Sequence, residues 1–333
     1  MSTQHDARPL LNPALLQETI ETALQSGATF AEVFVEDKRS TSAVLDDSKI
    51  EELTSGRRRG AGIRVILGET TGFAHTADLS PEGLQTAARA AAAAAQSAGN
   101  SNKSVAFASD GSMPAPVAAV MPDQVSGSQK VALLQKADQA ARGFQAAITQ
   151  VSAHYADSRR RIQIANSEGL LAGDDQVRTL FAVSCVAQGD LGRQTGRQSM
   201  GHTVGFEIFD SVDVESMALQ AAQRAYTKLS AVPAPSGEMP VVVGPGGGGV
   251  LFHEACGHGL EADIIAKSAS VFAGRRGEMV ANPMVTLVDD GTMAGEWGRY
   301  GVDDEGHLAQ RNVLIENGVL TDYMWDYLRA TKE

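Results

Sequence analysis

The fold class is decided by residues 31–76, which read AEVFVEDKRSTSAVLDDSKIEELTSGRRRGAGIRVILGETTGFAHT. At the start of this stretch Val33 and Val35 alternate with acidic side chains, and three further apolar runs follow, separated by Asp, Ser and Gly. An alternation with a period of two is typical of a strand that buries one face, and Asp, Ser and Gly favour turns. The stretch therefore predicts a meander of antiparallel strands.

Outward from this meander, apolar side chains at helical spacing and N-cap residues such as Ser80 predict four helices. They cover residues 13–27, 80–98, 128–146 and 211–230. Strand-like alternation fills residues 150–209, and a Pro-rich linker leads to a further short strand at Val241–Val243. Helices that alternate with antiparallel strand groups indicate an α+β fold. We expect an N-terminal domain of helices packed on a mostly antiparallel sheet, residues 1–230, and the start of a β-rich C-terminal domain, residues 239–333.

The composition describes a globular protein with an acidic surface. The 333 residues are 43% hydrophobic and carry a formal net charge of −12, which argues against direct binding of nucleic acid. No apolar stretch is long enough to span a membrane, and the N-terminus has no basic start followed by an apolar run. Only Cys185 and Cys256 occur, so no disulfide framework is implied. We therefore expect a cytoplasmic protein.

The chemistry is concentrated in residues 239–263, MPVVVGPGGGGVLFHEACGHGLEAD. Two imidazoles beside a carboxylate are what a zinc peptidase needs, and His253, Glu254 and His258 supply them. The histidines stand at i and i+5, which on a regular α-helix separates their directions by about 140°. A one-residue π-bulge would realign them. The spacing therefore predicts a kinked or bulged helix at Ala255–Gly259.

The same stretch also fits a nucleotide-binding pattern. Gly244, Gly246 and Gly249 satisfy G-x-G-x-x-G after a short apolar run, and Asp263 lies about twenty residues after the first of them. The second strand that should carry the acidic residue is missing from the sequence, and no Gly-Lys-Ser/Thr follows. Nucleotide binding is therefore the weaker alternative. The glycine run is equally compatible with a tight turn and with close approach of a peptide backbone.

At these residues the sequence resembles the TldD/PmbA family of zinc metallopeptidases. GVLFHEACGHGLEAD is similar to the H-E-x-x-x-H segment of the family's metal-bearing subunit. The resemblance continues through GAGIRVILGETTGFAHTADLS, SVFAGRRGEMVANPMVTLVDDGTM and GVDDEGHLAQRNVLIENGVLTDYM. It implies hydrolysis of unfolded or extended peptides, with His253 and His258 as Zn²⁺ ligands and Glu254 as general base. It also implies a heterodimer with an inactive paralogue, PmbA or TldE, that lacks these histidines.

Two further expectations concern the third ligand, of which only the first comes from the resemblance. The family's third zinc ligand is a cysteine in the C-terminal part, which we expect to lie beyond residue 333, so that this chain is truncated before it. Cys256 should point away from the histidine pair, whereas Glu261, three residues after His258, is a possible substitute ligand. An older family label, modulator of DNA gyrase, keeps a non-catalytic regulatory subunit open as an alternative function.

Overall fold

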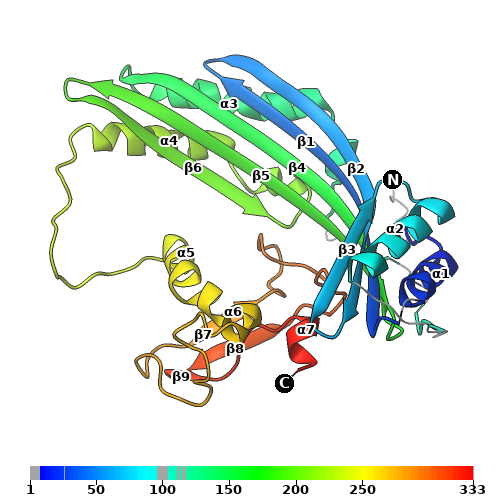
Figure 1. The fold of residues 1–333 in the computed structure, drawn as a ribbon. Coiled ribbons are helices and arrows are strands. Elements are labelled where there is room, and N and C mark those ends of the chain that lie inside the picture. Colours follow the sequence, from blue (N-terminus) through cyan, green and yellow to red (C-terminus); the bar gives the residue numbers. More distant parts are fainter. Residues whose placement is uncertain are drawn as a thin grey trace. The chain divides into compact units, whose positions relative to one another are not determined.

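A computed structural model describes residues 8–25, 27–95, 104–109, 111, 113, 114 and 118–332. The chain divides into two compact units. Unit 1 is Met1–Val232 with Met293–Leu308, and unit 2 is Pro233–Thr292 with Ala309–Glu333. Figure 1 shows the elements of both units. No helix in the described parts of the chain is long and apolar enough to cross a membrane.

Unit 1 is built on one six-stranded antiparallel sheet in the order β3-β2-β1-β4-β5-β6. The strands are β1 (Phe30–Asp46), β2 (Lys49–Leu67), β3 (Thr70–Thr76), β4 (Ile148–Asn166), β5 (Leu171–Gly189) and β6 (Gly192–His202). The predicted meander is therefore present as β1, β2 and β3. It has fewer and longer strands than the sequence suggested, because β1 is paired along almost its whole length with β2 on one side and β4 on the other.

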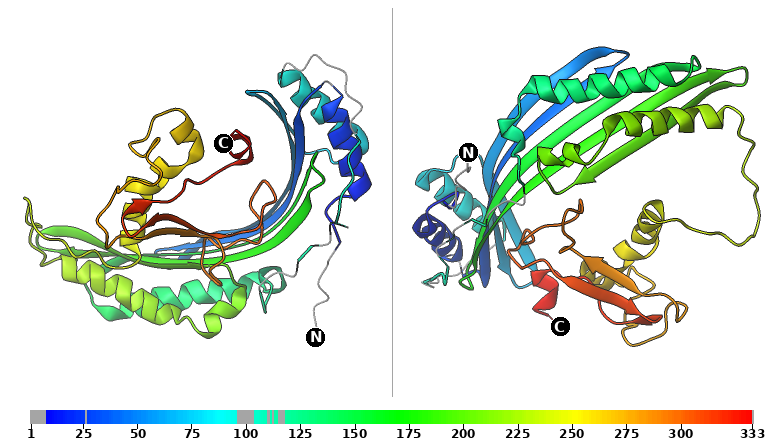
Figure 2. Two further views of the ribbon diagram at one scale, coloured as in Figure 1. Left: turned by 90° about the horizontal axis from the view of Figure 1, so that it is seen from below. Right: turned by 180° about the vertical axis from the view of Figure 1, so that it is seen from behind.

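Four helices cover one face of this sheet. They are α1 (Pro13–Leu24), α2 (Pro81–Ala94), α3 (Gly127–Phe144) and α4 (Val214–Lys228). Figure 2 shows them on the outer side of the curve that the strands follow. The odd-numbered residues of β1 explain this, since Val33 and Val35 pack under α1 and α2, while Ala43 and Leu45 pack under α3 and α4.

The helices begin close to the expected residues. Ser80 caps α2 by accepting a hydrogen bond from the Gly83 N–H. α3 starts one residue earlier than expected, because Ser126 and Gln129 form a reciprocal capping box. The last three residues of the predicted helix 80–98 lie outside the described residues.

The opposite face of the sheet is partly covered by residues 293–308, which belong to unit 1. Val302 packs on Ile162 and Ile164 from β4. The Gly301 N–H donates to Asp174 at 2.6 Å, and Glu305 pairs with Arg64 at 2.5 Å. A segment that is distant in the sequence is thereby fixed to the sheet by both apolar packing and ionic contacts.

Unit 2 holds a small antiparallel sheet and the broken helix that carries the histidines. The sheet is β7 (Leu287–Asp290), β8 (Arg311–Glu316) and β9 (Val319–Leu320), in that order. The helical elements are α5 (Gly247–Phe252), η3 (His253–Gly257), η4 (His258–Leu260), α6 (Ala262–Ala266) and α7 (Tyr327–Ala330). Leu260, Phe272, Leu314, Ile315, Leu320 and Tyr323 form the core.

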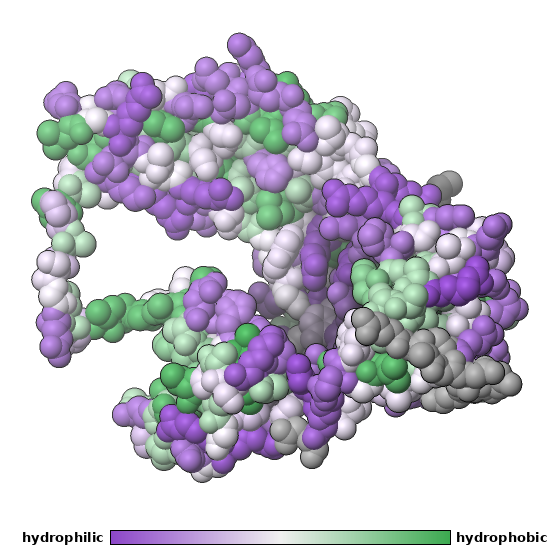
Figure 3. Space-filling view, viewed as in Figure 1, coloured by the Kyte–Doolittle hydropathy of each residue, from purple (hydrophilic) through white to green (hydrophobic). Residues whose placement is uncertain are grey.

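The α+β fold class predicted from the sequence is confirmed, with an antiparallel sheet and packed helices. The short strand predicted at Val241–Val243 is wrong. These valines form no ladder, and Val242 is 99% exposed. Figure 3 shows hydrophobic surface along the chain that leads into α5. The end of the predicted strand region 150–209 is also different, since residues Phe206–Asp210 form a 3₁₀ turn.

Candidate metal centre

The histidine helix contains a π turn at the predicted place. α5 runs into η3, a π-helical turn over His253–Gly257, and η4 is a 3₁₀ turn over His258–Leu260. The His258 N–H donates to the His253 carbonyl, which is the i→i+5 bond of a π-helix. This bond places the two histidines one helical turn apart on the same side of the helix, despite their five-residue spacing. The predicted bulge is therefore confirmed.

The π turn brings three potential ligand side chains together. One donor atom from each of His253, Glu254 and His258 lies within 4.8 Å of the other two. The imidazole centroids are 4.5 Å apart, with the rings inclined at 70°. Glu254 Oε2 is 3.8 Å from His258 Nε2. Two imidazoles and a carboxylate with this separation are a donor set that suits a transition metal such as zinc.

The site is accessible from solvent and lies beside a groove. About 65% of the Glu254 side chain and 53% of the His258 side chain are exposed. A groove of about 590 Å³ extends from His253, Gly257 and Glu261 to residues 285–289, the last three of which belong to the edge strand β7. In the part of unit 2 that the structure describes, β7 pairs only with β8, so its other edge carries free backbone groups.

Neither cysteine joins the histidine pair. Cys256 packs against the apolar core of unit 2, as its position between the histidines suggested. Cys185 is fully buried in β5, and burial raises the pKa of its thiol to about 11. Glu261 is also outside the group of three donors found among the described residues. Its Oε1 instead lies 2.7 Å from His258 Nδ1. The expectation that Glu261 substitutes as a ligand thus has no support in this geometry.

The glycine run forms a turn into α5. Gly246 has a φ of 80° and stands at the N-cap of that helix, a conformation that favours glycine. A dinucleotide site would need a strand before this turn and a second strand ending near Asp263. Residues 241–243 are not a strand, and Asp263 lies in α6, where it pairs with Lys267 at 2.9 Å. The described structure of unit 2 therefore lacks the context of a nucleotide site.

Two acidic turns, residues 289–291 and 303–306, are held by ordinary turn hydrogen bonds. Asp290 Oδ1 accepts from the Thr292 N–H, and Asp303 Oδ1 accepts from the N–H groups of Glu305 and His307. These contacts account for both turns without a bound ion.

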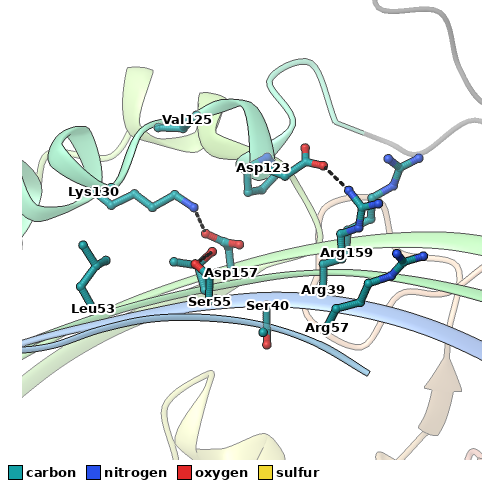
Figure 4. Close-up of a pocket in the computed structure, with 14 residues that line it drawn as sticks. Arg39, Ser40, Leu53, Ser55, Arg57, Asp123, Val125, Lys130, Asp157 and Arg159 are labelled. Atoms are coloured by element: carbon teal, nitrogen blue, oxygen red, sulfur yellow. Dashed lines mark hydrogen bonds and ion pairs between the residues drawn. The ribbon is translucent and has the colours of Figure 1, made fainter. Parts of the chain in front are cut away.

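Unit 1 has a separate polar cavity of about 550 Å³ between α3 and the sheet. Figure 4 shows two ion pairs in this cavity, with Lys130 pointing to Asp157 and Arg39 to Asp123. Arg159 is held by Asp175 through two guanidinium nitrogens. Because its cations already have carboxylate partners, this cavity is a weaker candidate for a functional site than the histidine cluster.

Three consecutive segments of the chain match the domains of one protein family. Residues 31–95 match the PmbA/TldA metallopeptidase domain 1, residues 121–229 its central domain, and residues 236–333 its C-terminal domain.

Curated relatives extend this similarity along most of the chain. A "Metalloprotease TldD homolog" of Haemophilus influenzae is 36% identical over 308 residues, which are 90% of this chain and 64% of the relative. A metalloprotease of Methanocaldococcus jannaschii is 31% identical over 314 residues, 92% of this chain and 68% of the relative. The chain thus spans about two thirds of the length of these relatives.

Solved structures have the same fold. TldE from Thermococcus kodakarensis superposes with a TM-score of 0.75 at 21% identity, over 95% of this chain and 71% of that one. A Bacteroides thetaiotaomicron protein, named as a candidate modulator of DNA gyrase, gives a TM-score of 0.79 at 18% identity, over 96% of this chain and 73% of that one. At these identities the likeness concerns the fold alone.

Proposed function

The chain belongs to the PmbA/TldD metallopeptidase family, and from this premise we propose that it is a zinc-dependent peptidase of the TldD type. His253 and His258 would hold the zinc ion, and Glu254 would act as general base. The observation that carries this proposal is the π turn, which gathers these three side chains within 4.8 Å in a sequence whose spacing would separate them on an α-helix.

The donor chemistry fits zinc, although two histidines do not complete a catalytic site. Such sites have three protein ligands and an open position. We propose that a cysteine completes the ligand set, as the family resemblance implies. A zinc ion held there would polarise the scissile carbonyl and acidify a water molecule.

Glu254 has the position and the environment of a general base. It directly follows His253, its carboxylate lies 3.8 Å from the His258 ring nitrogen, and it is open to solvent. From there it can accept a proton from the attacking water and return it to the leaving amine. Among the residues that the structure describes, its carboxylate contacts only His258, which leaves it available for proton transfer.

We propose that the substrate is an unfolded or extended peptide. The groove beside His253 includes β7, and an extended chain can add to the free edge of such a strand through backbone hydrogen bonds. Recognition of this kind depends little on the substrate's side chains. It therefore agrees with a peptidase of low sequence preference.

We also propose that the chain works in the cytoplasm as a heterodimer with a PmbA/TldE-like paralogue. Similarity to a TldE structure shows that both types of subunit share one fold, and the partnership itself follows from the family resemblance. Two free cysteines, Cys185 and Cys256, agree with a reducing compartment.

The decisive experiment is Glu254→Gln in the protein purified with its paralogue. We expect hydrolysis of an extended peptide to fall about 10²- to 10⁴-fold, because proton transfer is lost, while the zinc content stays unchanged. Glu238→Gln is the matched control, since Glu238 is exposed in the linker of unit 2. It should retain full activity.

Undiminished hydrolysis in Glu254→Gln would remove Glu254 as the base. If the wild-type complex holds zinc but hydrolyses no peptide, a non-catalytic regulatory role becomes the better description. Equilibrium binding of ATP or NAD by the wild-type chain would instead support the nucleotide alternative at Gly244–Gly249.

A further inference from the structure

The Glu261 carboxylate contacts one edge of the His258 imidazole. Glu261 Oε1 is 2.7 Å from Nδ1, a hydrogen-bonding distance. The opposite edge of the same ring, Nε2, faces Glu254 Oε2 at 3.8 Å. The two ring nitrogens of His258 are therefore in different surroundings. One meets a hydrogen-bond acceptor, and the other faces the space shared with His253 and Glu254.

The Glu261 side chain has no evident structural task that would explain this contact. It stands at the N-cap of α6 but makes no capping hydrogen bond. The backbone around it is fixed independently, because the Ala262 N–H donates to Met324 O and the Met324 N–H donates to Leu260 O, both at 2.9 Å. The position of residue 261 thus does not depend on its carboxylate, and the side chain turns back to His258 instead of capping the helix.

We propose that Glu261 is a positioning residue that fixes the tautomer and orientation of His258. By accepting a hydrogen bond from Nδ1–H, it leaves the lone pair on Nε2 directed at the space beside His253 and Glu254. This inference rests on the proposed metal site. A histidine ligand whose other ring nitrogen donates to a carboxylate is a stronger and better oriented ligand, and loss of that partner typically lowers metal affinity 10- to 100-fold.

The two histidines differ in this respect. Among the described residues neither ring nitrogen of His253 has a hydrogen-bond partner, so its ring is held by packing, including the contact with the His258 ring at 4.5 Å between the ring centroids. His258 follows the π turn, where the chain changes from π to 3₁₀ geometry and leaves the helix at Glu261 with a ψ of 130°. We infer that the ring at this transition needs a side-chain partner because the backbone there is less regular.

Three substitutions separate positioning from charge. Glu261→Asp keeps the charge and introduces a better N-cap residue, but it shortens the side chain so that it no longer reaches Nδ1. Glu261→Gln keeps an acceptor oxygen at full reach and removes the charge. Asp263→Asn removes a nearby exposed charge that pairs with Lys267 and is the matched control.

The readout is the dissociation constant for Zn²⁺, measured on the 333-residue chain by competition with a chromophoric chelator. The double variant His253→Ala/His258→Ala gives the background. We expect Glu261→Asp to weaken binding about 10- to 100-fold, Glu261→Gln to weaken it less, and Asp263→Asn to leave it unchanged. The thermal midpoint of the metal-free Glu261→Asp protein should be no lower than that of the wild type, since aspartate is a good N-cap residue, and this separates positioning from a structural role.

Several results would overturn the inference while leaving the metal site in place. One is wild-type affinity in Glu261→Asp. Another is a loss in Glu261→Gln as large as in Glu261→Asp, which would indicate direct ligation by a carboxylate at full reach instead of positioning. If the wild type binds no more Zn²⁺ than the double variant, both the proposed metal site and this inference are contradicted.

A second measurement does not depend on zinc. In metal-free protein at about pH 8, where an ordinary imidazole is neutral, ¹⁵N spectra of selectively labelled histidines report the tautomer of each ring. The His258 signal is assigned by its absence in His258→Gln. We expect the Nδ1–H form in the wild type and its loss in Glu261→Asp. An Nε2–H form in the wild type would contradict the proposed hydrogen bond.

Discussion

The Lys130 ammonium and the Asp157 carboxylate meet at 2.5 Å, and their side chains are only 3% and 6% exposed. Removing one partner of such a buried pair leaves an uncompensated charge. We expect Lys130→Met to lower the free energy of unfolding by about 3–5 kcal/mol, as measured by urea denaturation.

The exposed pair of Arg39 and Asp123 provides the control. Its side chains are 52% and 36% accessible, so Arg39→Met should cost less than about 1 kcal/mol. The double variant Lys130→Met/Asp157→Leu should recover most of the lost stability, because neither charge then remains buried. Equal destabilisation by Lys130→Met and Arg39→Met would contradict this account.

The residues of the candidate site were largely predictable, because a metal site needs particular chemical groups at a restricted spacing. His253, Glu254 and His258 could be selected from the sequence for that reason, and the structure places them together. Glu261 was selected for its proximity along a helix, as a possible ligand. Its actual contact with His258 Nδ1 depends on where the helix ends, which the residue pattern did not specify.

At the level of secondary structure, the π turn was expected because Gly257 and Gly259 flank His258. The structure shows that these two glycines have different surroundings. Gly257 has ordinary helical angles, φ −56° and ψ −55°, and a Cβ there would meet His253 Nδ1 at 3.7 Å, a normal contact. At Gly259 a Cβ would lie 3.2 Å from both the Phe272 ring and Ser270 Oγ. The π turn therefore does not need Gly257, whereas close packing favours Gly259.

This difference gives a prediction for two alanine substitutions. Gly257→Ala should leave zinc affinity unchanged and stabilise unit 2 by about 0.5–1 kcal/mol, because alanine loses less entropy in a helix. Gly259→Ala should destabilise it by about 1–3 kcal/mol through overpacking. Unfolding can be followed by Trp325 fluorescence after Trp297→Phe, since Trp325 lies in unit 2. Equal effects of the two substitutions would contradict the packing argument.

Strand boundaries show why local patterns are incomplete predictors. The sequence suggested breaks within residues 31–67, where polar and glycine residues accumulate. In the structure β1 and β2 continue through this region, with Arg39 paired in register with Arg57 on β2 and with Arg159 on β4. Hydrogen bonds from neighbouring strands override weak local preference. The valines at 241–243 favour a strand locally but do not form one, because among the described residues they have no neighbouring strand to pair with.

At the scale of the whole molecule, the chain leaves unit 1, forms most of unit 2, and returns to unit 1 at Met293–Leu308. The linker residues 231–244 are exposed throughout. We expect elastase to cut first here, at the accessible valines, because exposed irregular backbone is cleaved most readily.

After that cut the two fragments should remain associated in size-exclusion chromatography. The downstream fragment still carries residues 293–308, which attach to the unit 1 sheet through Val302, Gly301 and Glu305. Val302→Asp places a charge in this apolar contact, so the two fragments of this variant should separate after the cut. Separation of the wild-type fragments, or a first cut elsewhere, would count against this description of the units.

By itself, the sequence determined the fold class, the positions of most helices and the identity of the candidate ligands, because periodicity, capping and donor chemistry are properties of neighbouring residues. It also required a distorted helix, since five residues do not fit a regular turn. Only the tertiary structure decided which carboxylate contacts which imidazole edge, how far the strands run, and that residues 293–308 return to the first sheet. These features depend on contacts between residues far apart in the chain or on the exact point where a helix ends, and neither leaves a local pattern.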